Sequence, residues 1–442
     1  MRKLLAALAL GLLAVGVVTI LAMADPIDSQ AQEAPLMQGS VYYLNFKPEQ
    51  SAQWSTLAQA YTRATGVPVT VVTAASGTYE DTLRAEMVKN EPPTLFQVNG
   101  PVTLNSWKSY CLDLRDTALV QHLKSDEFAL KDGEQVLGVA YAIESYGLIC
   151  NRTLLGRAGY RPEEITSFAK LKSVAEDIQS RRQELGVLGA FASSGMDPSS
   201  DWRFKTHLAN VPIFYEYRDR GVSASDVLEG TYVDNYRQLF DLYIHNATCE
   251  PEMVGARTGE DAASEFALGE AVFYQNGTWA YQDVIAEGLK DSELAMIPLY
   301  MGIPGEETQG LCTGSENYWC INRRARPEDI EATKAFVDWL ITSSEGRYAL
   351  SNDMGFITPF DTFTDAELPQ NPLQQAALSD LSSGREPVGW AFTTIPSENW
   401  KTNVGAALLE YAQGSGGWET VESALIDGWA REASQSTLPK GT

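Results

Sequence analysis

Four tryptophans stand beside polar residues in segments that have the composition of turns or helix starts. They are Trp202 after Asp201, Trp279 after Asn276, Trp400 after Asn399, and Trp390. Sugars present apolar C–H faces and rings of hydroxyl groups, so a sugar site needs flat aromatic surfaces surrounded by amides and carboxylates. Each tryptophan alone could equally fill a core, but their coincidence with polar neighbours indicates carbohydrate binding.

Motifs for catalysis or metal binding are missing. His122, His207 and His245 are isolated, without the paired spacing of a metal site. The SxxK pattern from Ser167 to Lys170 opens a helix and has no matching SDN or KTG motif. We therefore expect no enzyme, no metal and no cofactor. Carboxylates are abundant, so a glycosidase-like carboxylate pair stays open as the alternative.

The composition excludes one class of partner. The formal net charge is −25, from 58 acidic and 33 basic residues. Such a chain offers no basic stripe for phosphates, so we expect no nucleic acid partner. The length of 442 residues with 44% hydrophobic residues predicts two or three folded domains.

The N-terminus has the organisation of an export signal. A positive start (Met1 to Lys3) precedes an apolar run that ends at the small-residue site Ala22 to Ala24. We predict a signal peptide over 1–24 and a flexible tether over 25–39. The protein is then exported, extracellular or periplasmic, and an uncleaved apolar run would tether it to the membrane.

Five cysteines form no CxxC motif. Cys312 and Cys320 flank a turn-like stretch between two short strands, and we interpret them as a candidate disulfide across a hairpin. Five buried free thiols are the alternative.

Strands and helices alternate in the first part of the chain. Strands are predicted over 41–46, 67–75 and 94–98, with helices over 47–66 and 76–93. This βαβαβ order indicates an α/β fold with a parallel sheet, in which ligands bind beyond the carboxyl ends of the strands. The polar residues at those ends are Asn45, Lys47, Glu49 and Asn99.

Later segments continue this pattern. The long extended stretch 137–151, interrupted by Glu144 and Ser145, predicts a strand that crosses between two bodies. The segment AVFYQ (271–275) predicts a strand that turns at Asn276 and Gly277. Helices are expected over 152–185, 231–246 and 329–350, and again near the C-terminus.

The segment FALGEAVFYQNGTW (266–279) resembles a signature of the extracellular solute-binding proteins of carbohydrate ABC importers, the maltose-binding-protein-like family. Four more segments agree with that family in the same order. They are PTLFQVNG with SYCLDLRD, AYAIESYGLICNRTLLGRAGY, MIPLYMGIPG with TGSENYWCINRRA, and DIEATKAFVDWLITSSEGRYALSNDMGFITPF. The resemblance covers about residues 40 to 430.

The resemblance implies a two-lobe periplasmic-binding-protein-like fold with hinge strands and a ligand cleft between the lobes. It places 40–143 with 300–355 in one lobe, and 144–299 with 356–442 in the other. The lobes would close on a sugar or oligosaccharide, and a monomeric complex would then deliver it to a membrane permease.

The resemblance also assigns residues to the cleft. Glu144 matches an acid on the first crossing strand, Trp279 a stacking tryptophan, and Trp400 an aromatic at the start of a late helix. Trp202 lies where the family often places another aromatic. The polar candidates are Asn45, Lys47, Glu49, Asn99, Asn276, Glu316 and Asn317.

Two other functions remain open from the sequence. One is an exported glycan-processing enzyme that uses a carboxylate pair, and the other is a ligand sensor of the same fold. Relatives of this fold also bind polyamines, iron or phosphate esters, and the stacking tryptophans favour sugar among these ligands. The sequence does not identify the sugar, the number of its residues or their linkage.

Overall fold

The computed structural model describes residues 39–193 and 195–435, which lie in one compact unit, Met37–Thr442. The predicted signal peptide (1–24) and, except for Gly39, the predicted tether (25–39) lie outside the described residues. Within the described ranges, no helix is long and apolar enough to cross a membrane.

The first of two sheets has six strands in the order β2-β1-β3-β11-β5-β4. Their bounds are Val41–Asn45 (β1), Val69–Thr73 (β2), Leu95–Val98 (β3), Ala129–Asp132 (β4), Gln135–Ala140 (β5) and Tyr318–Ile321 (β11). Strand β1 pairs in parallel with β2 and β3, whereas β11 runs antiparallel between β3 and β5. The predicted βαβαβ order of the first part is therefore confirmed.

The second sheet has the order β12-β10-β6-β8-β7, with β9 also paired to β6. Its strands are Glu144–Asn151 (β6), Gly189–Phe191 (β7), Ala271–Gly277 (β8), Leu294–Ile297 (β9), Gln309–Gly314 (β10) and Glu386–Val388 (β12). Every residue of β6 is buried, which fits its place in the middle of the sheet.

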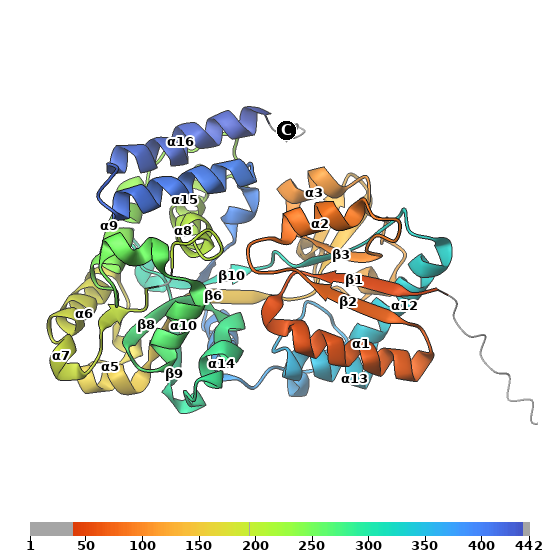
Figure 1. The fold of residues 1–442 in the computed structure, drawn as a ribbon, viewed down its shortest axis with the longest axis horizontal. Helices are drawn as coiled ribbons and strands as arrows, with labels where there is room; N and C mark the ends of the chain where they lie inside the picture. Colours follow the sequence, from red (N-terminus) through yellow and green to blue (C-terminus); the bar gives the residue numbers. More distant parts are fainter. Residues whose placement is uncertain (1–38, 194, 436–442) are drawn as a thin grey trace, which may run out of the picture. The chain divides into compact units, whose positions relative to one another are not determined.

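Helices cover both sheets (Figure 1). Those of the first half are Ser51–Thr65 (α1), Tyr79–Met87 (α2), Pro101–Trp107 (α3), Ala118–Gln121 (α4), Arg152–Ala158 (α5), Phe168–Ser180 (α6), Arg182–Leu185 (α7) and Ala209–Arg220 (α8). The others are Val233–His245 (α9), Gly259–Ala267 (α10), Tyr281–Ala286 (α11), Pro327–Thr342 (α12), Ser344–Tyr348 (α13), Pro372–Ser382 (α14), Glu398–Ala412 (α15) and Trp418–Gln435 (α16).

Helix α1 illustrates how the sequence pattern places an element. Trp54, Leu57, Ala58 and Tyr61 recur at helical spacing and are all buried against the first sheet. The helix ends at Gly66, whose φ of 78° is a left-handed conformation that favours glycine. Burial of this apolar face holds the loop at the start of α1 against the carboxyl end of β1.

Each sheet has its own hydrophobic core, so the predicted two-lobe α/β architecture is confirmed. We call the body around β1–β5 and β11 the first lobe, and the body around β6–β10 and β12 the second lobe. Strand β10 lies in the second lobe, although the expected division placed 300–355 in the first.

Short connections join the lobes. Residues 141–143 link β5 to β6, and residues 315–317 link β10 to β11. A third connection runs beside the first, because Ile143 forms an isolated antiparallel bridge with Ile357. The long strand expected over 137–151 is thus two strands, one in each sheet.

The cysteines require a correction. Cys312 lies on β10 opposite Tyr146 in the second sheet, whereas Cys320 lies on β11 opposite Phe96 in the first sheet. The predicted disulfide between them is not formed, and all five cysteines are free thiols. The stretch between these cysteines crosses from one lobe to the other instead of closing a hairpin.

Gly147, in the middle of β6, provides a test of this packing. A Cβ atom there would lie 2.3 Å from the carbonyl oxygen of Ile297 and 2.9 Å from Leu311 Cδ2. Gly147→Ala should therefore lower the free energy of unfolding by about 1–3 kcal/mol, measured by urea denaturation.

Gly156→Ala on α5 is the matched control, because no heavy atom lies within 4 Å of its Cβ position. This change should be neutral or stabilise by up to about 1 kcal/mol. Equal effects of the two substitutions would contradict the packing described for β6.

Candidate functional site

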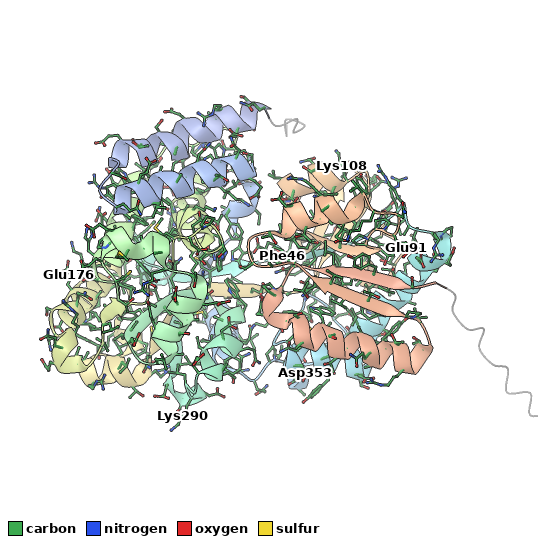
Figure 2. The ribbon with its side chains drawn as sticks, in the orientation of Figure 1. Phe46, Glu91, Lys108, Glu176, Lys290 and Asp353 are labelled. Carbon is green, nitrogen blue, oxygen red and sulfur yellow. The ribbon has the colours of Figure 1, made fainter. Side chains whose placement is uncertain are left out.

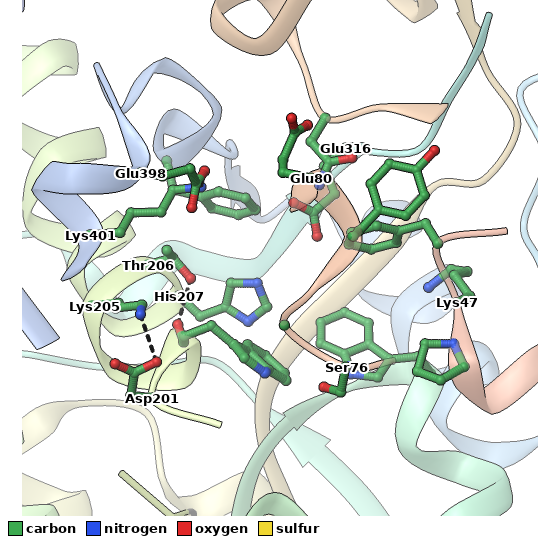
Figure 3. A pocket seen from close by; sticks show the side chains of 18 of the residues that line it. Lys47, Ser76, Glu80, Asp201, Lys205, Thr206, His207, Glu316, Glu398 and Lys401 are labelled. Carbon is green, nitrogen blue, oxygen red and sulfur yellow. Dashed lines mark hydrogen bonds and ion pairs between the residues drawn. The ribbon is translucent and has the colours of Figure 1, made fainter. Parts of the chain in front are cut away.

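A cavity of about 260 Å³ lies between the two lobes (Figure 3). The first lobe contributes the loop after β1, the start of α2 and the end of β3. The second lobe contributes the segment 198–207, Trp279 after β8, and the start of α15. The cavity thus lies at the carboxyl edge of the parallel strands, where α/β sheets usually bind ligands.

The loop after β1 supplies two of the polar residues expected at the site. Lys47 and Glu49 line the cavity, and Asn99 lines it from the end of β3. Asn45 does not line it, because its side chain is fully buried and supports the loop. Asn45 Nδ2 donates to the Lys47 carbonyl oxygen at 2.7 Å, and its Oδ1 accepts from the Lys47 amide at 3.1 Å.

Lys47 joins the two lobes through buried ion pairs. Its Nζ lies 2.9 Å from Glu144 Oε1 and 3.0 Å from Glu49 Oε1, and the side chains of Lys47 and Glu144 are only 5% and 3% exposed. Desolvation opposes the charge of Lys47, but attraction by Glu144 and Glu49 outweighs it and raises the lysine pKa above its ordinary value. Lys47 therefore stays charged at neutral pH.

Asn317 holds the other oxygen of this carboxylate. Its Nδ2 donates to Glu144 Oε2 at 2.8 Å, and the side chain is fully buried. Asn317 therefore supports Glu144 and is not part of the cavity lining, where the resemblance had placed it. Its neighbour Glu316 does line the cavity.

Trp279 and Trp202 form the aromatic part of the wall. Their ring centroids are 6.2 Å apart with planes inclined by 51°. The ammonium group of Lys47 lies 5.8 Å from the Trp279 ring centroid, and the Arg203 guanidinium lies 4.2 Å from that of Trp202. Both rings are partly exposed at the cavity, as a stacking surface requires.

The position of Trp279 depends on a glycine, although for a different reason than expected. Strand β8 continues through Gly277, whose φ of −114° is extended, so no turn occurs there. A Cβ atom at Gly277 would lie 2.1 Å from the Trp279 ring. Because glycine has no Cβ atom, the Trp279 indole can pack directly against the backbone at this position.

Asn276 and Trp400 have structural roles. Asn276 is 3% exposed, and its amide donates to the Tyr274 hydroxyl at 2.6 Å. Trp400 is fully buried, packs edge-on against Trp429, and donates from Nε1 to the Leu425 carbonyl oxygen at 3.0 Å. Neither residue lines the cavity, so the expectation that they lie in the cleft is corrected.

Two ion pairs of the second lobe also line the cavity and were not predicted from the sequence. Lys205 Nζ lies 2.7 Å from Asp201 Oδ1, and Lys401 Nζ lies 2.7 Å from Glu398 Oε1. The spacings i,i+4 and i,i+3 are those of facing residues on a helix, so this signal was available in the sequence. It did not indicate that both pairs face the same cavity.

His207 was also missed, because the sequence shows it without a partner. The side chain is 5% exposed and its ring stacks on Tyr146, with centroids 4.3 Å apart and planes inclined by 10°. Desolvation, assisted by the positive charges of Arg203, Lys401 and Lys47, lowers the pKa of His207 well below its ordinary value. The imidazole is therefore neutral at neutral pH.

Two acids that line the cavity, Glu316 and Glu80, form no salt bridge with the lysines that line it. Burial raises the pKa of Glu316 to about 7, although Lys401 and Lys47 oppose the shift. Burial also raises the pKa of Glu80, a further residue that the sequence analysis missed. Glu80 Oε1 is buried without a hydrogen-bond partner in the part of the chain that the structure describes.

The Lys47 ion pair predicts a large loss of stability when it is broken. Lys47→Met leaves the buried Glu144 carboxylate unpaired, so the free energy of unfolding should fall by about 3–5 kcal/mol in urea denaturation. The double variant Lys47→Met/Glu144→Gln should recover most of this loss. Lys131→Met, which breaks an exposed pair with Asp126, is the control and should cost less than about 1 kcal/mol. A similar cost for both single variants would contradict the role given to Lys47.

Glu316 predicts a pH-dependent effect on stability. With a folded-state pKa raised from 4.5 to about 7, the folded protein keeps a proton that the unfolded chain releases in this range. The contribution of Glu316 to stability therefore falls as the pH rises from 4.5 to about 7.

Glu316→Gln should melt close to wild type at about pH 4, and progressively higher than wild type as the pH rises through that window. Thermal melts at half-unit pH steps measure this difference, with the exposed Glu91→Gln as control. Parallel melting curves for wild type and Glu316→Gln would contradict the assignment.

Comparisons with solved structures agree with the two-lobe fold. A solved chitin oligosaccharide binding protein is 15% identical, with a TM-score of 0.71 over 90% of this chain and 98% of its own. RafE in complex with raffinose is 15% identical, with a TM-score of 0.65 over 90% and 98%. A sugar transporter protein from Bacillus licheniformis, in complex with stachyose, is 14% identical, with a TM-score of 0.67 over 89% and 100%. At these identities the likeness shows the fold alone.

A comparison with curated proteins gives no match. The family model described as bacterial extracellular solute-binding protein matches residues 56–376 of the chain. This match spans more than half of the sequence and includes strands of both lobes. The chain therefore belongs to the bacterial extracellular solute-binding protein family.

Proposed function

We propose that this protein is the exported substrate-binding component of an ABC importer, which captures a sugar or oligosaccharide between its two lobes and delivers it to a membrane permease. The observation that carries the proposal is the cavity wall. Trp202 and Trp279 offer aromatic faces, while Lys47, Glu49 and Asn99 from the first lobe offer polar groups opposite them. Sugar rings combine apolar faces with equatorial hydroxyls, which fits this division.

Capture between the lobes is supported by contacts at the edge of the cavity. Ser76 and Gly77 from the first lobe approach Ser199 of the second lobe. Ser76 Oγ lies 3.5 Å from the Ser199 carbonyl oxygen, and a Cβ at Gly77 would lie 3.3 Å from Ser199 Cα. A ligand that contacts both lobes favours this arrangement over an open one, because it gains its full binding free energy only here.

The neighbouring solved structures include proteins described as binding chitin oligosaccharide, raffinose and stachyose. These names support sugar as the ligand class for this chain. The family description supports an extracellular location. We propose that the protein acts as a monomer that binds without catalysis. We also propose that the lobes divide as the sequence predicts, except that 300–314 join the second lobe and 356–363 join the first.

The proposal predicts a ligand-dependent gain in thermal stability that depends on Trp279. In a thermal-shift screen against mono- and oligosaccharides, a sugar at 100 times its dissociation constant should stabilise wild type by about 2.7 kcal/mol. Trp279→Ala should lose this sugar-induced shift, because the ring that covers the sugar face is gone.

Trp339→Ala is the matched control, since Trp339 is also partly buried but packs against Tyr61, outside the cavity. This variant should keep the shift even if its unliganded melting temperature falls. No shift with any sugar, but a shift with polyamines or phosphorylated compounds, would contradict the proposed ligand class.

A further inference from the structure

The cavity carries more negative than positive groups. Six carboxylates line it against three lysines, and no arginine lies in its wall. Each lysine is already paired: Lys47 with Glu144 and Glu49, Lys205 with Asp201, and Lys401 with Glu398. The two carboxylates that remain are Glu80 and Glu316.

Glu316 lies in the connection between β10 and β11. Its carboxylate forms no hydrogen bond or ion pair with any residue that the structure describes, whereas the adjacent Asn317 is bonded to Glu144. Burial disfavours its charge, and the surrounding lysines only partly offset that cost. A carboxyl group in this setting either keeps its proton or ionises beside a positive group, and the protein places no such group against it.

Glu80 lies in the first turn of α2 and lines the cavity from the first lobe. Its Oε2 accepts a hydrogen bond from Trp107 Nε1 at 3.1 Å, and its nearest cation, Arg84, is 3.9 Å away with a side chain that is 60% exposed. The other oxygen, Oε1, is buried and unpartnered among the described residues. The charge of Glu80 is therefore poorly compensated.

Both acids belong to the same part of the cavity. The charges of Glu398 and Lys401 act on Glu80 and on Glu316 alike. Figure 3 shows the four side chains around the upper part of the cavity, with Lys47 and His207 below them. The Lys401 ammonium is bonded to Glu398 and forms no ion pair with Glu80 or Glu316 among the described residues.

Two further observations indicate an organic ligand. His207 is 95% buried, faces the cavity, and has no hydrogen bond to its ring within the described ranges, so a donor and an acceptor are available there. No group of acidic, histidine or cysteine side chains in the described part of the chain could hold a metal ion.

We propose that the ligand is a sugar that carries a basic nitrogen, an amino or imino group, whose positive charge lies between Glu80 and Glu316. This inference rests on the proposed function and specifies its substrate class. Charge-assisted hydrogen bonds from the nitrogen satisfy the free carboxylate oxygens, while the sugar faces pack on Trp279 and Trp202. His207 contributes a neutral hydrogen bond and adds no repelling charge.

The test is isothermal titration calorimetry of the full chain at pH 7 and low salt. The ligands are mono-, di- and trisaccharides of gluco and galacto configuration, each in hydroxyl, N-acetyl and free-amine form, with spermidine as a separate arm. At least one free-amine member should bind tenfold or more tightly than its hydroxyl and N-acetyl counterparts. Added salt should reduce this preference.

Glu316→Gln and Glu80→Gln should each reduce the preference for the amine at least fivefold. Glu91→Gln is the control, because Glu91 is exposed and lies away from the cavity, on the far side of the first lobe from Phe46 (Figure 2). A preference that survives in both cavity variants would overturn the assignment of these two acids.

Equal or tighter binding of the hydroxyl forms would overturn the inference while the proposed function stands. Binding of spermidine without binding of any sugar would contradict the proposed function itself, and with it the inference. Absence of binding by every member of the set, spermidine included, would contradict both.

Discussion

A buried ammonium group holds the site together. Lys47 follows the first strand of the first lobe, and its two carboxylate partners are Glu49 in the same loop and Glu144 at the start of β6 in the second lobe. A charge without water must have close partners of opposite sign, so the loop after β1 cannot move away from β6 without a large cost. Asn317, from the next connection, fixes the remaining oxygen of Glu144. One polar network of Lys47, Glu49, Glu144 and Asn317 therefore joins the loop after β1, the start of β6 and the β10–β11 connection.

The site residues that follow directly after parallel strands could be predicted from the sequence. Lys47, Glu49 and Asn99 line the cavity because the carboxyl ends of parallel strands share one edge of a sheet. Trp279 was placed correctly at the cavity from its motif, although Gly277 provides space for the indole and not a turn. Local propensity could not reveal that residues 315–317 pass between sheets, so the pairing of Cys312 with Cys320 was wrong.

The remaining site residues depend on tertiary packing that no local pattern shows. His207 lacks a sequence partner, yet the stacked Tyr146 ring from β6 fixes it at the cavity. Glu80 and Glu316 come from segments far apart in the chain and share an environment only after both lobes have formed. Conversely, Asn45 and Trp400 have the residue types of a sugar site, but their polar atoms are bonded within the protein. The order of motifs thus identified the family, while burial decided which side chains line the cavity.

We expect one ligand to contact both lobes in this cavity. A crystal structure of the protein with its highest-affinity sugar tests this expectation most directly. We expect a sugar ring against Trp279 or Trp202 of the second lobe, with hydroxyl or amino groups bonded to Lys47, Glu49 or Glu80 of the first lobe. A sugar bound outside the cavity, or in contact with one lobe alone, would contradict it.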